Sequence, residues 1–240
     1  MIGCVRKMEN GLSQLTLGLS LKNEATFENF YLGSNTEVLK ELKRTVLGEG
    51  ERMIYLCGAR GQGLSHLLQA ACHFAHQHQF TSVYLPLADL LALSPEVLQG
   101  FDRHAVICLD DLHVIAGLPE WEEALFHFYN RVYDVGGRLM MAGHDLPKSI
   151  SFLLPDLVSR LSAAMVYQLR SLSDEEKLFM LIARADQRGI FLSEEVGKYI
   201  LTHCPRHART LLAALDVLDK ASLAAKRRLT IPFIKEVLQI

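Results

Sequence analysis

The feature that most constrains the fold is an alternation between short apolar runs and segments with helical spacing of their apolar residues. Near-continuous apolar runs are typical of strands that are covered on both faces, as in a parallel sheet. Five runs are predicted as strands, at residues 53–57, 82–86, 105–110, 138–142 and 163–169. Helical spacing lies between them, notably at 65–79 and 120–135. The alternation predicts an α/β fold, a doubly wound module with a parallel five-stranded sheet.

The alternation stops near residue 170, and an all-helical segment follows. The pair Ser173 and Glu176 has the spacing of a capping box, in which each side chain satisfies an amide of the first helical turn. Four helices are predicted: from Ser173 to about Arg188, from about Ser193, from Pro205 to Arg228, and a short one capped by Thr230. We therefore expect a flexible N-terminal arm at 1–24, an α/β nucleotide-binding domain at 25–171 and a small helical lid domain at 172–240.

Composition excludes several classes of protein. The 240 residues are 50% hydrophobic with a formal net charge of −2, which disfavours strong autonomous binding to nucleic acid because phosphate neutralisation needs a basic surface. The five cysteines are scattered without a C-x-x-C pair, so neither a disulfide framework nor a zinc site is predicted. The chain shows no signal-peptide pattern and no apolar stretch of membrane-spanning length, and we expect a cytoplasmic protein without membrane contact.

A glycine-rich segment stands between the first predicted strand and the following helix, where a Walker A phosphate loop, G-x-x-x-x-G-K-[ST], would stand. Its backbone amides and the helix N-terminus favour phosphate oxygens, and a serine hydroxyl at its last position is a magnesium ligand. The alternative is a glycine-rich turn without a ligand. The predicted nucleotide-binding residues are Gly58, Ala59, Arg60, Gly61, Gln62, Gly63, Leu64, Ser65 and His66, with Ser65 also binding Mg²⁺.

The loop departs from its pattern at Leu64, where lysine normally contacts the β- and γ-phosphates. A hydrogen bond to a charged group contributes roughly 1.5–3 kcal/mol, so nucleotide binding can survive this loss. Hydrolysis suffers more, because the lysine also neutralises charge in the transition state. We therefore expect a bound nucleoside diphosphate, ADP before ATP, with weak or no intrinsic ATPase activity. Arg60 is a candidate for a replacement phosphate contact, and a solvated loop residue is the alternative.

The third predicted strand ends in Asp110 and Asp111, which has the form of a Walker B motif. Asp110 is predicted to hold magnesium and Asp111 to orient the attacking water. An apolar strand that ends in two acids is common, but its position after the phosphate loop makes the assignment specific. We expect the second strand to lie away from the loop, so that the two motifs occupy neighbouring strands.

Further segments resemble the DnaA family of AAA+ replication initiators. Residues 26–35 resemble that family's nucleotide-base box, 143–147 lie at its sensor 1 position, 154–161 resemble its arginine-finger box, and 205–211 fall at its sensor 2 position. The resemblance implies that Tyr31 and Leu32 pack on the base, that Asp145 lies at the nucleotide, and that Arg206 touches its phosphates. It also implies that Arg160 is an arginine finger acting in trans. The alternatives are core packing for Tyr31 and Leu32, a surface ion pair for Arg206, and a helix-end surface position for Arg160.

Near the N-terminus, one segment is similar to the short motif by which bacterial proteins dock on the DNA polymerase sliding clamp. Its residues are Gln14, Leu15, Thr16, Leu17, Gly18 and Leu19, and a disordered arm with scattered leucines is the alternative. DnaA proteins continue into a DNA-binding domain, whereas this sequence stops after the predicted lid. The combination implies a regulator that docks on the clamp and promotes hydrolysis of DnaA-bound ATP, which prevents re-initiation of DNA replication. Little direct DNA binding is then expected, and self-association is compatible with the fold.

Two other functions compete with this one. A helicase-loader-type AAA+ ATPase would hydrolyse ATP and bind single-stranded DNA, which the charge balance disfavours. A P-loop kinase normally keeps the lysine that Leu64 replaces, and has no use for a clamp motif. His73, His76 and His78 have a spacing that suits a metal, but a solvated helix end explains them better, since no carboxylate or cysteine completes the set.

Overall fold

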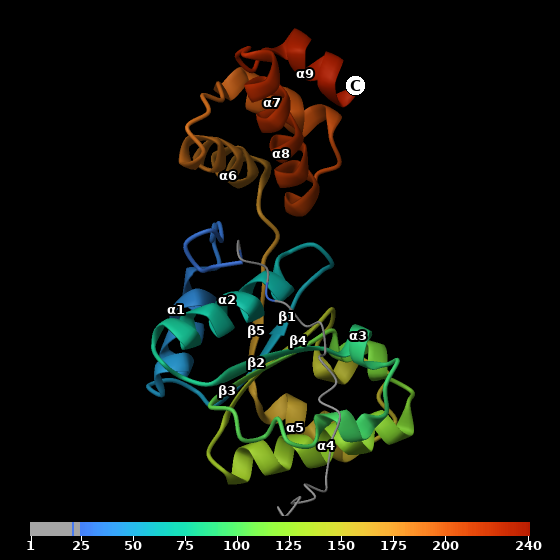
Figure 1. Ribbon diagram of the computed structural model, residues 1–240. Helices are drawn as coiled ribbons and strands as arrows, with labels where there is room; N and C mark the ends of the chain where they lie inside the picture. The colour runs from blue at the N-terminus through green and yellow to red at the C-terminus, as the bar shows by residue number, and fades with distance from the viewer. Residues whose placement is uncertain (1–20, 22–24) are drawn as a thin grey trace, which may run out of the picture.

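A five-stranded parallel sheet forms the centre of the molecule (Figure 1). The computed structural model describes residue 21 and residues 25–240. The strands lie in the order β2-β3-β4-β1-β5, and every neighbouring pair is parallel. They are β1 (Met53–Cys57), β2 (Ser82–Pro86), β3 (Val106–Asp110), β4 (Arg138–Gly143) and β5 (Met165–Gln168). The predicted strands and their parallel arrangement are confirmed. Strand β3 is one residue shorter than predicted, and β5 is shorter at both ends; at its start, residues 163 and 164 end the preceding helix.

The expectation that the two nucleotide motifs occupy neighbouring strands is wrong. Strand β4 lies between β1 and β3, with Leu139 paired to Met53 on one side and to Ile107 on the other. All but the first residue of β4 are buried, which suits a strand that has neighbours on both edges and helices on both faces. The loop after β1 and the acids at the end of β3 still meet at one edge of the sheet, because all the strands are parallel.

Helices cover both faces of the sheet. One face carries α1 (Thr36–Leu47) and α2 (Leu64–Gln77), and the other carries α4 (Pro119–Asp134) and α5 (Pro155–Ala163), as Figure 1 shows. Side chains of a strand alternate between faces. In β1, Ile54 and Leu56 therefore pack with α1 and α2, whereas Tyr55 packs toward α4 and α5. Trp121, to which the sequence assigned no role, belongs to the second of these cores.

Short elements complete this part of the chain. They are helix α3 (Leu87–Leu90) and the 3-10 helices Pro95–Leu98, Leu112–Ile115 and Pro147–Ser149. Within the described residues, no helix is long and apolar enough to cross a membrane.

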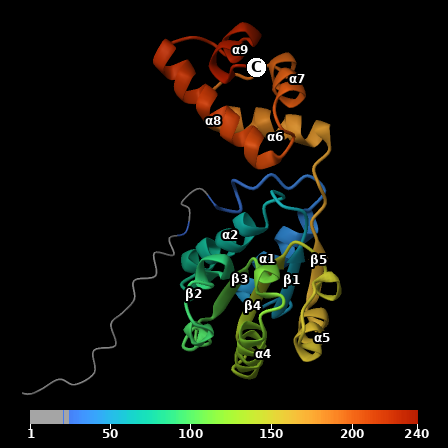
Figure 2. The same ribbon diagram turned by 90° about the vertical axis from the view of Figure 1, so that its right-hand side faces the viewer.

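The remaining helices form a separate cluster above the sheet (Figure 2). They are α6 (Asp174–Gln187), α7 (Glu194–His203), α8 (Ala208–Ala225) and α9 (Ile231–Leu238), and we call them the lid. Their shared core contains Leu181, Ile200, Leu211 and Ile234. The predicted capping box is confirmed: Glu176 N donates to Ser173 Oγ at 3.1 Å, and Ser173 N donates to Glu176 Oε2 at 2.7 Å.

Helix α8 and the cap of α9 differ from the prediction, and α8 ends at Ala225 rather than Arg228. Helix α8 begins at Ala208, three residues after the predicted start at Pro205, because Cys204 and His207 have extended backbones. A residue before proline is disfavoured in the helical region, which keeps Cys204 extended. Thr230 precedes α9, but its side chain makes no capping hydrogen bond.

Candidate functional site

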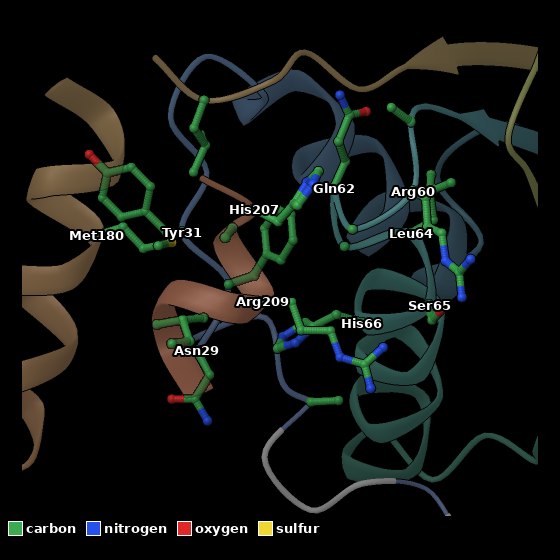
Figure 3. A pocket seen from close by; sticks show the side chains of 18 of the residues that line it. Asn29, Tyr31, Arg60, Gln62, Leu64, Ser65, His66, Met180, His207 and Arg209 are labelled. Carbon is green, nitrogen blue, oxygen red and sulfur yellow. The ribbon is translucent and has the colours of Figure 1, made fainter. Parts of the chain in front are cut away.

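A cavity of about 1080 Å³ lies between the sheet and the lid. Ligand sites in proteins typically enclose roughly 300–1,000 Å³, so this volume accommodates a nucleotide. Its lining includes residues 28–31, the glycine-rich loop with the start of α2, the ends of β3 and β4, residues 170–172, and the facing sides of α6 and α8 (Figure 3). A crevice at the carboxyl ends of parallel strands is the usual ligand position in open α/β sheets.

The glycine-rich loop turns sharply into α2 at Gly63. Gly63 precedes α2 with a φ of 96°, and a Cβ there would lie 2.5 Å from a ring carbon of Phe30. Glycine at this position is therefore required both by its left-handed backbone and by the close approach of Phe30. The lid meets the same loop, since a Cβ on Gly61 would lie 3.9 Å from the His207 side chain. Backbone amides at the start of α2 consequently face a space that the lid closes from above.

Tyr84 connects the two predicted magnesium ligands. Its hydroxyl donates to Asp110 Oδ2 at 2.6 Å, and the side chains of Ser65 and Gln69 lie close to it. Burial, followed by the charge of Asp110, raises the pKa of the Tyr84 hydroxyl. Asp110 accepts a second hydrogen bond from the Asp111 amide at 2.9 Å. Ser65 and Asp110 thus lie within reach of one phenol, and their oxygens are the donors that Mg²⁺ prefers.

Asp111 lies beside two histidines that the sequence analysis did not use. Its backbone is left-handed, with a φ of 58°, and the following 3-10 helix brings His113 next to it. His144 comes from the end of β4 and stacks on His113, with ring centroids 3.8 Å apart. Burial, followed by the charge of Asp110, raises the pKa of the Asp111 carboxyl. Burial, followed by His144, lowers the pKa of His113, so the neutral imidazole is favoured.

Leu64 contributes no charge to the cavity. Its side chain is 7% exposed and packs with Leu67, Leu56 and Leu169 in the core between the sheet and α2. Basic residues nevertheless outnumber acidic ones along the cavity, seven against four. The basic residues are Arg60, Arg170, Lys177, Arg184, Arg188, Arg206 and Arg209, and the acidic ones are Glu28, Asp110, Asp111 and Asp216. The surroundings therefore favour an anionic ligand without the lysine.

Two arginines of this set bear on the sensor 2 prediction. Arg206 lines the cavity, but its guanidinium donates to Asp174 at 3.0 Å. Arg209, which the sequence analysis did not single out, forms no ion pair with any described residue. It extends from the first turn of α8 across the cavity toward α2, and Arg60 points toward Ser65 from the loop (Figure 3). Arg209 lies in the first turn of α8, and this position would have identified it. Because the predicted start of α8 is three residues too early, the sequence did not single it out.

At the other end of the cavity, Tyr31 lies beside Met180 of α6 (Figure 3). Tyr31 is partly buried against the lid core. Its position is compatible with the predicted contact with the base and with the alternative of core packing. His66 also lines the cavity, but its Nε2 lies 2.8 Å from the Thr26 carbonyl oxygen, which fixes residues 25–31 to α2.

Four predicted site residues do not line the cavity: Leu32, Gly58, Asp145 and Arg160. Asp145 is exposed, and its carbonyl accepts a hydrogen bond from Tyr55 at 2.9 Å; Gly143 and His144 line the cavity in its place. Arg160 is exposed on α5, against the far face of the sheet (Figure 1). The predicted clamp motif, residues 14–19, lies outside the described residues.

Solved structures with a similar fold include two DnaA proteins. The chain is similar to domain III of the Thermotoga maritima replication initiation protein DnaA, with a TM-score of 0.78 and 21% identity over 92% of this chain and 98% of that chain. It is also similar to AMPPCP-bound DnaA from Aquifex aeolicus (TM-score 0.74, 21% identity, 84% and 67% of the two chains). The Thermotoga maritima RuvB Holliday junction branch migration motor is more distant (TM-score 0.64, 14% identity, 90% and 71%). These likenesses establish the fold of a sheet with a helical lid.

The lid carries the more specific match. Residues 174–238 match the family model described as the lid domain of Hda. This match covers all four lid helices, and the DnaA-like fold accounts for the sheet below them. The lid is therefore similar to the lid domain of Hda, and the part of the chain below it has a DnaA-like fold.

Proposed function

We propose that this chain is a nucleotide-bound regulator of replication initiation, which docks on the DNA polymerase sliding clamp and promotes hydrolysis of DnaA-bound ATP. In this proposal residues 25–171 are the nucleotide-binding domain, 172–240 are the lid domain, and 14–19 are the clamp-docking motif. Arg160 is the arginine finger that acts in trans.

The position of Arg160 is the observation that carries the proposal. The residue is exposed, forms no ion pair with any described residue, and does not line the cavity of its own chain. It therefore has no reach to a nucleotide bound there. It lies on α5, which leads into the edge strand β5, and the exposed Leu153 and Met165 flank this helix. An exposed cation on this helix, with exposed apolar residues before and after the helix, is suited to a second protein, whose bound nucleotide it would meet there.

The decisive experiment compares Arg160→Ala with wild type in hydrolysis of DnaA-bound ATP, with clamp loaded on DNA. A finger contacts charge that develops in the transition state, so its loss reduces the rate by about 10³–10⁵-fold while affinity is retained. Arg103→Ala, another exposed arginine on the same part of the molecule, is the matched control and should keep full stimulation. Full stimulation by Arg160→Ala at matched thermal stability would reject the finger, and failure of wild type to stimulate would reject the proposed function.

The cavity takes a nucleoside diphosphate in this proposal, with ADP favoured over ATP. The glycine-rich loop binds the phosphates, Ser65 and Asp110 hold Mg²⁺, and Tyr31 with Met180 contacts the base. The ion would neutralise phosphate charge when bound. Because Leu64 lies in the core, Arg60 from the loop and Arg209 from the lid supply the positive charge that the missing lysine would give.

Titration of purified protein with ADP and Mg²⁺ tests this assignment. Arg209→Ala should weaken ADP binding by about 10–100-fold, the equivalent of a charged hydrogen bond of roughly 1.5–3 kcal/mol. Arg206→Ala should have a smaller effect, since its guanidinium is already paired with Asp174. ATP turnover should stay well below about one per second, the low end of typical enzymes. Equal losses in the two variants, or faster turnover, would contradict the assignment.

Clamp docking is tested separately. Replacing Gln14, Leu15 and Leu17 together by alanine should abolish binding to purified clamp without changing the thermal stability or ADP affinity. Undiminished clamp affinity in this variant would remove the docking motif from the proposal.

A further inference from the structure

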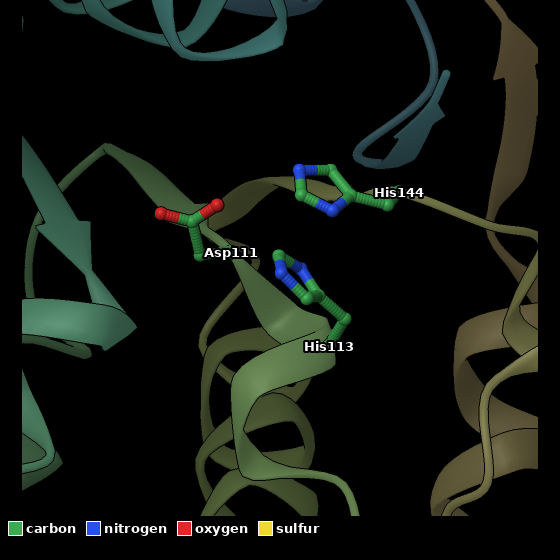
Figure 4. A group of neighbouring side chains, drawn as sticks. All are labelled: Asp111, His113 and His144. Atoms are coloured by element: carbon green, nitrogen blue, oxygen red, sulfur yellow. The ribbon is translucent and has the colours of Figure 1, made fainter. Parts of the chain in front are cut away.

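Asp111, which is predicted to orient the attacking water, forms a cluster with His113 and His144, two residues to which the proposed function gives no role. One potential ligand atom from each residue lies within 4.8 Å of the other two, and Figure 4 shows the carboxylate facing the two stacked rings. We propose that these three residues bind a divalent transition-metal ion of the zinc class. The proposal does not require a nucleotide.

The topology explains why the three residues meet. Strands β3 and β4 are parallel neighbours, with Leu109 paired to Met141, so the residues that follow them emerge side by side. The left-handed Asp111 then turns the chain into a 3-10 helix, which returns His113 to the strand end. Because the backbone of two adjacent strands fixes this arrangement, the cluster is largely preformed and a metal would not have to organise it.

The donor set selects the kind of ion. Two imidazoles with one carboxylate suit zinc, cobalt, nickel and iron, whereas magnesium and calcium prefer oxygen alone. Metal–ligand bonds of about 2.0–2.2 Å require the three atoms to approach one another further, which small rotations of exposed or half-buried side chains allow. The site is therefore distinct in chemistry from the oxygen site of Ser65 and Asp110.

Within residue 21 and residues 25–240, two of the potential ligand groups in the cluster also lack hydrogen-bond partners. The Nδ1 atom of His113 is buried and has no hydrogen-bond partner among the described residues. No residue in the described part of the chain donates a hydrogen bond to the Asp111 carboxylate. A buried polar atom without a partner costs roughly 1–3 kcal/mol, and coordination would remove that cost.

All three residues line the cavity. Three protein ligands leave at least one coordination position for water or for an oxygen of a cavity ligand. A phosphate as that ligand would rest on the proposed function, whereas the three protein ligands do not. The metal would then place positive charge at the strand ends, where Leu64 supplies none.

The test uses full-length protein without a histidine tag, freed of metal with a chelator and kept free of nucleotide. Co²⁺ is titrated while its visible absorption is followed, and Zn²⁺ is then added as a competitor. We expect one Co²⁺ per chain, displaced by Zn²⁺ but not by millimolar Mg²⁺. His144→Ala and His113→Gln should each weaken Co²⁺ binding by at least about tenfold, since even outer partners of metal ligands change affinity by about 10–100-fold.

His76→Ala is the matched control, because His76 is exposed and belongs to the other histidine-rich segment. It should leave Co²⁺ binding unchanged. No binding by wild type, equal binding by His144→Ala, or loss of binding in His76→Ala would overturn the proposal. If wild type bound no Co²⁺, the two histidines would be a stacked pair that does not bind metal. His144 is half-exposed at the cavity, so its variant decides the question if His113→Gln unfolds. The affinity for ADP is measured in parallel. It shows whether a variant has lost metal binding alone or nucleotide binding as well.

Discussion

The sheet and the lid bury their apolar residues to different extents. Every residue of β1 and β3 is buried, and helices cover both faces of the sheet. The smaller lid also has a closed core, yet it leaves Phe179, Phe191 and Leu223 more than 60% exposed, against Val135 and Leu153 in the larger sheet region. The sheet and its helices therefore enclose a large buried core, whereas the lid has a smaller core and a larger share of exposed apolar surface.

Polar contacts connect these parts, together with the packing of Tyr31 on the lid core. Asn35 accepts from the Arg170 amide at 2.8 Å and donates to the Arg170 carbonyl at 3.1 Å, and Arg184 of α6 donates to the Asn29 side chain at 2.9 Å. Such contacts hold a position without burying much apolar surface. We therefore expect the position of the lid to depend on these few contacts and on what fills the cavity, whereas the sheet region depends on its own buried core.

The largest effect is expected inside the sheet region, at Glu122. Its fully buried carboxylate accepts hydrogen bonds from the amides of Gly117, Leu153 and Leu154, each at 2.8 Å. Glu122→Ala leaves three donors without a partner, and each costs about 1–3 kcal/mol, so the free energy of unfolding should fall by about 3 kcal/mol or more. Denaturant unfolding measures this change, with the exposed neighbour Glu123→Ala as the control at under about 0.5 kcal/mol. A similar small change in both variants would show that the sheet region does not depend on this buried acid.

The variant Leu64→Lys tests whether a side chain at position 64 can leave the core and reach the cavity. A lysine that extends into the cavity should strengthen ATP binding by about 10–100-fold, corresponding to roughly 1.5–3 kcal/mol. Turnover need not follow, because hydrolysis also depends on a neighbour's arginine. Titration calorimetry with ATP measures the change, and Leu64→Met, which conserves volume without charge, should leave affinity unaltered. Equal affinities for the two variants would mean that the lysine stays among the core side chains and never reaches the phosphates.

Asn35→Ala cuts the connection between sheet and lid. The loss of both hydrogen bonds to Arg170 should cost about 1–2 kcal/mol and should loosen the segment at 170–173 more than either core. Hydrogen exchange of lid and sheet amides, with limited proteolysis of this segment, distinguishes the two effects. If exchange rose equally in the sheet, then Asn35 would support the whole molecule and the division between the parts would be weaker than described.

The smallest effect belongs to the lid alone. Ser173→Ala removes one half of the capping box of α6 and should cost about 1 kcal/mol. Ser193→Ala, which removes a longer cap of 3.4 Å from α7, should cost less. Thermal unfolding of both variants measures the difference, and the sheet amides should keep their exchange rates. A reversed order of the two variants would contradict the hydrogen-bond geometry.

Local patterns identified much of this protein. Apolar runs of strand length predicted all five strands, because a strand buried on both faces needs an unbroken apolar sequence. The glycine-rich loop and the acids after β3 were found because their chemistry depends on adjacent residues. The capping box followed from the spacing of Ser173 and Glu176 alone.

What the sequence could not supply depends on contacts between distant segments. Only the tertiary structure decided that β4 lies between the two nucleotide motifs, that Leu64 packs into the core, and that Glu122 bonds three amides. It also paired Arg206 with Asp174, left Arg209 to face the cavity, and stacked His144 on His113. The physical reason is that local sequence sets backbone propensity and apolar periodicity, whereas strand order and side-chain partners depend on how elements far apart in the chain pack together.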